Sequence, residues 1–449
     1  MASTYLSATL GTATNRKKWT YSAWVKKSRP QASVDEQIFG SYADATTSYY
    51  SRIADNGSSK FEFTEYNGSA YSINLRPSNK QRDVNGWYHI VVGYDSTQAT
   101  ASNRVKFYIN GEQVTTWTQE SYPSQNYESG INKNQLHTIG KETSNSSYYF
   151  DGSMSHVHFI DGTQYAASDF GETDSTTGEW KIKTSPNVTY GNNGFFILKN
   201  GNSVTDQSGE GNNWAVGGGT LTKTEDNPSN VFATGNALIG NHSNGNALVP
   251  NYSNGNTTSS YGSGEWRIHQ STLGASSGKY YCEYKWVSNS NTAYAYVGIY
   301  DLDGYAQKVT GYPYMADMAN CFSIKDGNGQ VWTGSSGTSY GTSYTVGDII
   351  GVAMDLDNNK CYWSKNGTWM NSANPSSGTG GYSITADKTY AFGIQQYSQG
   401  GSTWSANYGN GYFGTTAVSS AGTNASNLGI FEYDVPSGYT ALCTKGLNE

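Results

Sequence analysis

Two segments in different halves of this chain repeat one strand–loop–strand pattern, covering residues 87–114 and residues 347–369. Each has an apolar run that ends at an Asp, a polar loop, an alternating strand and an Asn-Gly pair. Alternation with a period of two predicts half-buried antiparallel strands. Asn-Gly predicts a hairpin, because a type I′ turn needs a positive φ at both central residues. The sequence therefore predicts an all-β chain with two tandem antiparallel β-sandwiches.

Turn signals divide the 449 residues further. Residues 1–165 and 263–408 each hold short strands between Gly, Asn and Ser turns, which is typical of a sandwich or jelly roll. We expect residues 166–235 to form an extension that wraps the first sandwich. Residues 236–262 are rich in Asn, Gly and Ser and are predicted to be a linker, and residues 409–449 are predicted to be a C-terminal tail.

The composition combines few charges with many aromatic residues. Charged residues make up 14% of the chain, against roughly 25% in typical proteins, and there are 37 Tyr and 12 Trp. Tyr gives binding surfaces contact area at low entropic cost, although its high strand propensity is an alternative explanation. The formal net charge is −7. We expect no nucleic-acid partner, because such proteins normally carry a basic face.

The N-terminus and the cysteines indicate where the protein folds. No secretory signal is recognisable, and no run approaches the roughly 18–20 apolar residues that span a bilayer. The cysteines form no CxxC pair and have no His close by, which argues against a zinc site. We expect them to be reduced, with Cys361 in the core, and we expect cytoplasmic synthesis without membrane insertion.

Motifs in both halves resemble known families. The first half resembles the laminin-G-like, concanavalin A-like jelly rolls at residues 21–28, 86–95, 105–114 and 149–162. The second half resembles SPRY (B30.2-like) sandwiches at residues 277–286, 294–301 and 346–367. The stretches 170–180, 190–202 and 206–214, and the ending 435–449, resemble parts of bacteriophage virion proteins, particularly of marine, cyanophage-like phages.

The resemblance to virion proteins implies a function. It implies a phage fibre or adhesin at the virion surface, made in the host cytoplasm, that contacts host cell-surface glycan without enzymatic activity. Other virion proteins are the implied partners, together with further copies of the chain in a homo-oligomer for which a trimer is favoured. A structural capsid or tail decoration protein without receptor binding is one alternative, and a glycan depolymerase is another.

The depolymerase alternative requires suitably placed acids. Retaining glycosidases need two carboxyl groups about 5 Å apart, and glucanases with a concanavalin-like fold carry them in a Glu-x-Asp-x-x-Glu run that this chain lacks. Glu62 and Glu65 are predicted to point to opposite faces of a strand, because their spacing is odd. Glu432 and Asp434 lie in the tail without a third acid. We therefore predict that the protein is not an enzyme.

Aromatic side chains on loops are the candidate glycan contacts. Sugars pack their apolar faces on aromatic rings that a rigid scaffold presents. SPRY-like domains bind partners through loops at one end, so the resemblance implies loop aromatics of the second half as binding residues: Tyr312, Tyr314, Trp332, Tyr340 and Trp369. The alternative for each ring is packing on the local surface.

No cofactor or metal is predicted. His156 and His158 share a predicted strand face, but no acidic or Cys partner accompanies them, and we expect packing. Laminin-G-like domains sometimes hold calcium, for which Asp55 and Asp95 are conceivable ligands. Calcium takes six to eight oxygen ligands, and the sequence does not identify such a set.

Overall fold

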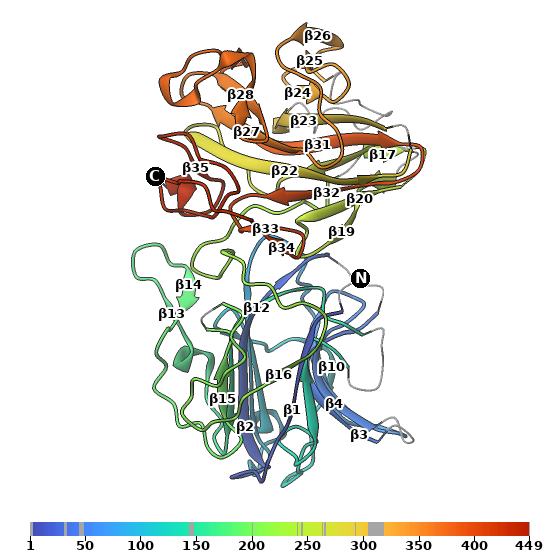
Figure 1. The fold of residues 1–449 in the computed structure, drawn as a ribbon. Helices are drawn as coiled ribbons and strands as arrows, with labels where there is room; N and C mark the ends of the chain where they lie inside the picture. Colours follow the sequence, from blue (N-terminus) through green and yellow to red (C-terminus); the bar gives the residue numbers. More distant parts are fainter. Residues whose placement is uncertain are drawn as a thin grey trace. The chain divides into compact units, whose positions relative to one another are not determined.

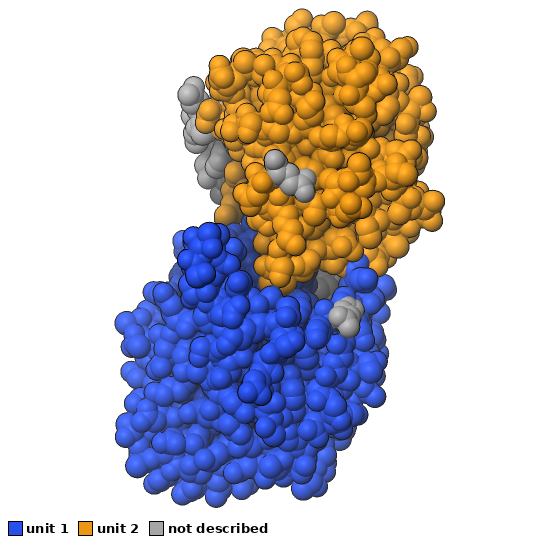
Figure 2. All heavy atoms as spheres, turned by 90° about the vertical axis from the view of Figure 1, so that its left-hand side faces the viewer, with its two compact units in different colours: residues 1–223 blue, residues 224–449 orange. Residues whose placement is uncertain are grey.

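The computed structural model describes residues 3–30, 34–44, 49–142, 148–199, 201–239, 241–243, 246–262, 264, 266–291, 293–303 and 318–448. The chain divides into two compact units, residues 1–223 and 224–449, which Figure 2 shows in separate colours. Each unit is built of mainly antiparallel sheets (Figure 1). Each unit also has a hydrophobic core. Among the described residues, no helix is long and apolar enough to cross a membrane.

The first unit is a sandwich of two sheets. One sheet has eight strands in the order β10 (Trp117–Ser121), β6 (Tyr71–Pro77), β5 (Phe61–Asn67), β4 (Tyr49–Asp55), β3 (Glu36–Asp44), β11 (Leu136–Ile139), β1 (Tyr5–Thr9) and β16 (Ala215–Gly218). The other has six, in the order β15 (Phe195–Ile197), β12 (Gly152–Asp161), β2 (Lys18–Lys27), β7 (Tyr88–Asp95), β8 (Val105–Ile109) and β9 (Glu112–Gln113). Alternating side chains from both layers meet in the core, where Tyr21 stacks on Phe39 at 4.7 Å.

The second unit repeats this architecture. Its larger sheet runs β19 (Asn251–Ser253), β20 (Thr258–Tyr261), β32 (Ser402–Asn407), β22 (Lys279–Asn289), β27 (Ile349–Asp355), β28 (Lys360–Lys365) and β29 (Thr368–Trp369), with β30 (Tyr382–Ser383) on β28 and β35 (Thr440–Ala441) on β22. Its smaller sheet runs β21 (Trp266–Gln270), β31 (Tyr390–Ser398), β23 (Ala293–Asp301), β24 (Phe322–Lys325), β25 (Gln330–Thr333) and β26 (Ser336–Ser339). Trp363 joins the layers by donating its indole N–H to the Val297 carbonyl at 2.9 Å.

The predicted fold class and both hairpins are confirmed. Asn110 and Gly111, between β8 and β9, have φ values of 49° and 84°. Asn366 and Gly367, between β28 and β29, have φ values of 48° and 80°. These are the positive φ values that a type I′ turn requires. Cys361 is fully buried in the second core, as predicted.

Segments outside the two predicted sandwiches also contribute strands. The predicted extension supplies β15 and β16, which lie at one edge of each sheet of the first unit. The predicted linker supplies β20, which pairs with β32 inside the larger sheet of the second unit. The predicted tail supplies β35 and the fully buried Leu442 of the second core. The composition of these segments is polar and Gly-rich, so it did not reveal the pairings. Backbone hydrogen bonds stabilise these pairings, and such bonds do not depend on an apolar side-chain pattern.

Candidate functional site: an aromatic platform on the second sandwich

Strand register brings three aromatic rings into one row on the smaller sheet of the second unit. Trp266 of β21 pairs with Tyr397 of β31, and Tyr397 pairs with Tyr294 of β23. Directly paired residues share a face, and the next residue of each strand points to the other face. Ala295, which follows Tyr294, belongs to the core, so the row lies on the outer face. We call this row, with Tyr296 and Trp332, the aromatic platform.

The rings of the platform contact one another. The Trp266 ring centroid lies 5.5 Å from that of Tyr397 and 6.4 Å from that of Tyr294, and the two Tyr centroids are 6.3 Å apart. Tyr296 connects the row to Trp332, with centroid distances of 5.9 Å to Trp266 and 6.4 Å to Trp332. Tyr296 is nearly buried at 7% exposure, whereas Tyr294 is 43% exposed. The platform therefore has a packed base and an accessible rim.

A lysine lies over this aromatic surface. Lys325 of β24 is the register partner of Tyr296. Its Nζ lies 5.4 Å from the ring centroid of Trp332, 5.5 Å from that of Tyr294 and 5.9 Å from that of Tyr296. Ammonium groups at such distances are attracted by the negative faces of aromatic rings. The site thus combines flat apolar surface with hydrogen-bond donors, which suits a hydroxyl-bearing ring with one apolar face.

The structure distributes the predicted binding residues among different environments. Trp332 lies on the platform. Tyr340 is only 8% exposed, its hydroxyl donates to the Gly380 carbonyl at 3.0 Å, and its ring packs in the core. Trp369 is half-buried on β29, with its centroid 6.2 Å from that of Tyr281. Tyr312 and Tyr314 lie outside the described residues.

Sequence reasoning missed Trp266, Tyr294 and Tyr397 as site residues. Trp266 and Tyr294 lie in predicted strands, Tyr397 lies beyond the predicted end of its strand, and binding residues were expected on loops. One signal was available: in residues 293–301, Tyr294 and Tyr296 share one face of the strand, while Val297 and Ile299 give the other face large apolar side chains. A strand that is apolar on both faces is buried on both faces or presents a binding surface on one of them.

The histidines of β12 pack against neighbouring aromatic rings. A bulge between Ser155 and His158 disturbs the register, and His156 has a φ of 48°. His158 is 2% exposed and stacks on Phe196 with 3.8 Å between centroids. Burial lowers the pKa of His156 to about 4 and that of His158 well below its usual value, so both rings are neutral at pH 7. The described part of the chain has no group of three or more His, Cys, Asp or Glu placed to hold a metal ion.

The two aspartates considered for calcium have partners within the first sandwich. Asp55 forms an ion pair of 2.6 Å with Lys27, and both side chains are almost fully buried. Asp95 accepts hydrogen bonds from Thr97 and Gln98. Each carboxylate therefore has at least one partner within the first sandwich.

Glu62 and Glu65 of β5 point to opposite faces, as their spacing predicts. Glu62 lies 3.0 Å from Arg76 and 3.5 Å from Arg52 in ion pairs. Glu65 instead accepts the Tyr49 hydroxyl at 2.7 Å and the Gly130 N–H at 3.0 Å. Both side chains are fully buried. This pair therefore does not form the facing carboxylates that glycoside hydrolysis uses.

Comparisons with known proteins agree with part of this description. The family model for the concanavalin A-like lectin/glucanases superfamily matches residues 1–168. A Ran-binding proteins 9/10 homolog of Drosophila melanogaster is 33% identical over 98 residues, which are 21% of this chain and only 9% of that protein. The family match supports a concanavalin-like first sandwich, and lectin-like sandwiches are in general terms binding modules.

Similar solved structures include SPRY domains and a pentraxin. The SPRY domain of human HERC1 is 19% identical, with a TM-score of 0.25, and the match covers 33% of this chain and 87% of that domain. The heptameric SAP-like pentraxin from Limulus polyphemus is 15% identical, with a TM-score of 0.27, and the match covers 36% of this chain and 71% of that one.

Proposed function

We propose that this protein is a non-enzymatic binding protein of a phage virion surface, and that its aromatic platform contacts glycan on the host cell. The row of Trp266, Tyr397 and Tyr294 is the observation that carries the proposal. Aromatic rings attract the apolar C–H face of a sugar and tolerate several sugar types, and the Lys325 ammonium adds hydrogen-bond donors. The virion setting rests on the resemblance of the extension and the chain ending to phage proteins.

Weak contacts of this kind become effective through multiplicity. A flat platform gives modest affinity for one sugar ring, because a rim residue such as Tyr294 removes only part of the ligand from water. Copies of the chain in a homo-oligomer, for which we favour a trimer, would face a surface that repeats the same sugar. Linked sites gain avidity through their effective concentration, without any new contact.

Binding of the labelled full chain to host-range bacteria, with and without competing surface polysaccharide, tests the proposal. We expect saturable binding that the polysaccharide competes. Tyr294→Ala should weaken it by about tenfold, because a stacking ring is lost at an exposed position. Tyr71→Ala is the matched control, since Tyr71 of the first sandwich is 41% exposed against 43% for Tyr294.

Three other outcomes would contradict the proposal. Equal losses in the Tyr294→Ala and Tyr71→Ala variants would mean that the platform is not the contact surface. Absence of binding by the folded protein would favour a decoration or joining role within the virion. Shortening of the polysaccharide during incubation, measured by size-exclusion chromatography, would favour a depolymerase.

A further inference from the structure

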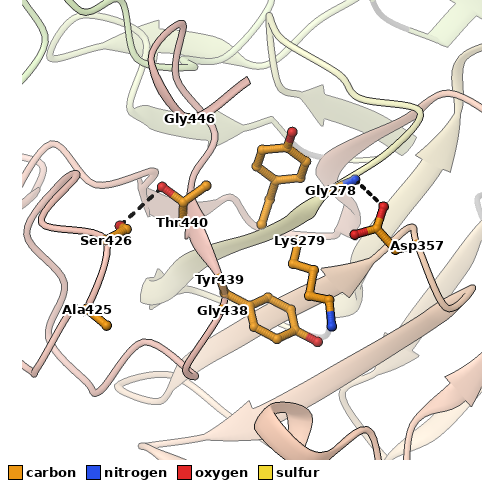
Figure 3. A pocket seen from close by; sticks show the side chains of 10 residues that line it. Gly278, Lys279, Asp357, Ala425, Ser426, Gly438, Tyr439, Thr440 and Gly446 are labelled. Carbon is orange, nitrogen blue, oxygen red and sulfur yellow. Dashed lines mark hydrogen bonds between the residues drawn. The ribbon is translucent and has the colours of Figure 1, made fainter. Parts of the chain in front are cut away.

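A second site lies in the same unit, beside the larger sheet. A cavity of about 380 Å³ is lined on one side by the first residues of β22 and the turn after β27. Its other side is the C-terminal segment, between residues 425 and 446 (Figure 3). This volume is near the lower end of the roughly 300–1,000 Å³ that small-molecule sites occupy. The platform lies on the smaller sheet, so the two sites are separate.

Charged groups in the cavity offer both donors and acceptors. Lys279 forms an ion pair with Asp355 at 3.0 Å, and its Nζ lies 5.8 Å from the ring centroid of Tyr439. Asp357 accepts the Gly278 N–H through Oδ1 at 2.7 Å, which leaves Oδ2 as an acceptor for a ligand. Because Asp355 already balances Lys279, the cavity has no excess of positive charge for an anion.

Hydroxyl groups and aromatic rings complete the lining. The Thr440 hydroxyl donates to that of Ser426 at 3.1 Å (Figure 3). Tyr439 is 1% exposed, and its hydroxyl has no hydrogen-bond partner among the described residues. Tyr280 also borders the cavity, and its ring belongs to the hydrophobic core of the second unit. The hydroxyls of Ser426 and Thr440 thus add hydrogen-bonding groups to the charged groups of the lining.

We propose that this cavity binds one neutral monosaccharide residue. Neighbouring hydroxyls of a pyranose would donate to Asp357 and accept from Lys279, while the Ser426 and Thr440 hydroxyls offer further hydrogen bonds. This inference goes beyond the platform, which suits a chain of sugars on a surface. The sandwich and the C-terminal segment both line the cavity, so a bound sugar would hold the C-terminal segment against the sandwich.

The test uses the full chain with D-glucose, D-galactose, N-acetylglucosamine and glucuronate, and with putrescine and inorganic phosphate as non-sugar probes. We expect at least one neutral sugar to bind in saturation-transfer NMR and to slow amide exchange in residues 425–446. Asp357→Asn should weaken that binding by at least about tenfold, because the amide replaces a carboxylate acceptor. Asp387→Asn, at an exposed Asp outside the cavity, is the control and should bind normally.

Several results would overturn the inference. These are binding by putrescine or phosphate alone, no binding by any neutral sugar, or unchanged sugar binding by Asp357→Asn. Tyr294→Ala should leave monosaccharide binding intact, and Asp357→Asn should leave binding to host cells intact. Failure of the cavity and failure of the platform are therefore distinguishable.

Discussion

A buried carboxyl group shows how one residue fixes the C-terminal segment. Glu283 of β22 is fully buried. It accepts the backbone N–H groups of Glu432 and Tyr433 at 2.9 and 2.8 Å, the Asn407 amide at 3.1 Å and the Tyr281 hydroxyl at 3.2 Å. Burial raises its pKa to about 7, although these hydrogen bonds act in the opposite direction. One side chain thus joins the sandwich to residues distant in the sequence.

This raised pKa predicts a pH dependence of stability. Between pH 4.5 and about 7, the folded state holds a proton on Glu283 that the unfolded state has released. The free energy of unfolding therefore falls as pH rises through this window, by about 3 kcal/mol for this group. We expect Glu283→Gln to lose most of this slope, because an amide stays neutral. Calorimetry measures the Tm of both proteins. The Tm of the wild type minus that of the variant should become smaller, or change sign, as the pH rises from about 5 to about 8.

Glu432→Gln is the control for this prediction. Glu432 lies in the same segment, but its side chain accepts from the exposed Ser419 rather than from the core. Glu432→Gln leaves the Glu283 side chain in place, so this variant should keep the slope that Glu283 produces. Parallel Tm curves for wild type and Glu283→Gln would mean that Glu283 titrates in the folded state as it does when unfolded. Glu36 of the first sandwich, with its pKa also raised to about 7 by burial, should give its own unit the same sign of dependence.

At the scale of elements, glycines with a positive φ have two separable roles. Gly367, in the turn from β28 to β29, has a φ of 80°, and a Cβ there would lie 2.6 Å from the Tyr433 ring. Gly378, which ends the short 3-10 helix Pro375–Ser377, has a φ of 77°, but a Cβ there would meet nothing within 4 Å. The first glycine permits both the turn and the close approach of the C-terminal segment, whereas the second permits only the turn.

Alanine variants at these glycines separate strain from contact. Gly378→Ala should cost about 1 kcal/mol, which is typical of an L-residue in the left-handed region. Gly367→Ala should cost at least about 2 kcal/mol, because the methyl group also displaces Tyr433. Urea unfolding measures both values. An equal loss of unfolding free energy in both variants would show that Tyr433 and the C-terminal segment move aside without an energetic cost.

At the scale of the molecule, each unit has a hydrophobic core of its own. Phe63 belongs to the first core and Trp363 to the second, and both are fully buried. Separate cores allow separate cooperative unfolding. We expect calorimetry of the full chain to resolve two transitions.

Conservative core variants assign these transitions. Phe63→Leu should lower the Tm of one transition and Trp363→Phe that of the other, each through a loss of about 1–3 kcal/mol. Within each variant, the unchanged transition serves as the internal control. A single transition that both variants shift would mean that the units unfold as one cooperative body.

The strands and hairpins were predictable because their signals are local. Alternation and Asn-Gly pairs lie within a few residues of one another, and β8 and β27 lie within the two repeated segments 87–114 and 347–369. The edge strands β15 and β16 were not predicted. Their residues have little alternation, and their partners β12 and β1 lie far away in the sequence.

The sequence by itself determined an all-β chain, the two sandwiches, the hairpins and the burial of Cys361, because side-chain periodicity and turn chemistry act over short distances. Only the tertiary structure decided which aromatic rings form a surface. Trp266, Tyr294 and Tyr397 become neighbours through the pairing of β21, β31 and β23, whereas Tyr340 enters the core. The physical reason is strand register, since a shift by one residue would move each ring to the opposite face.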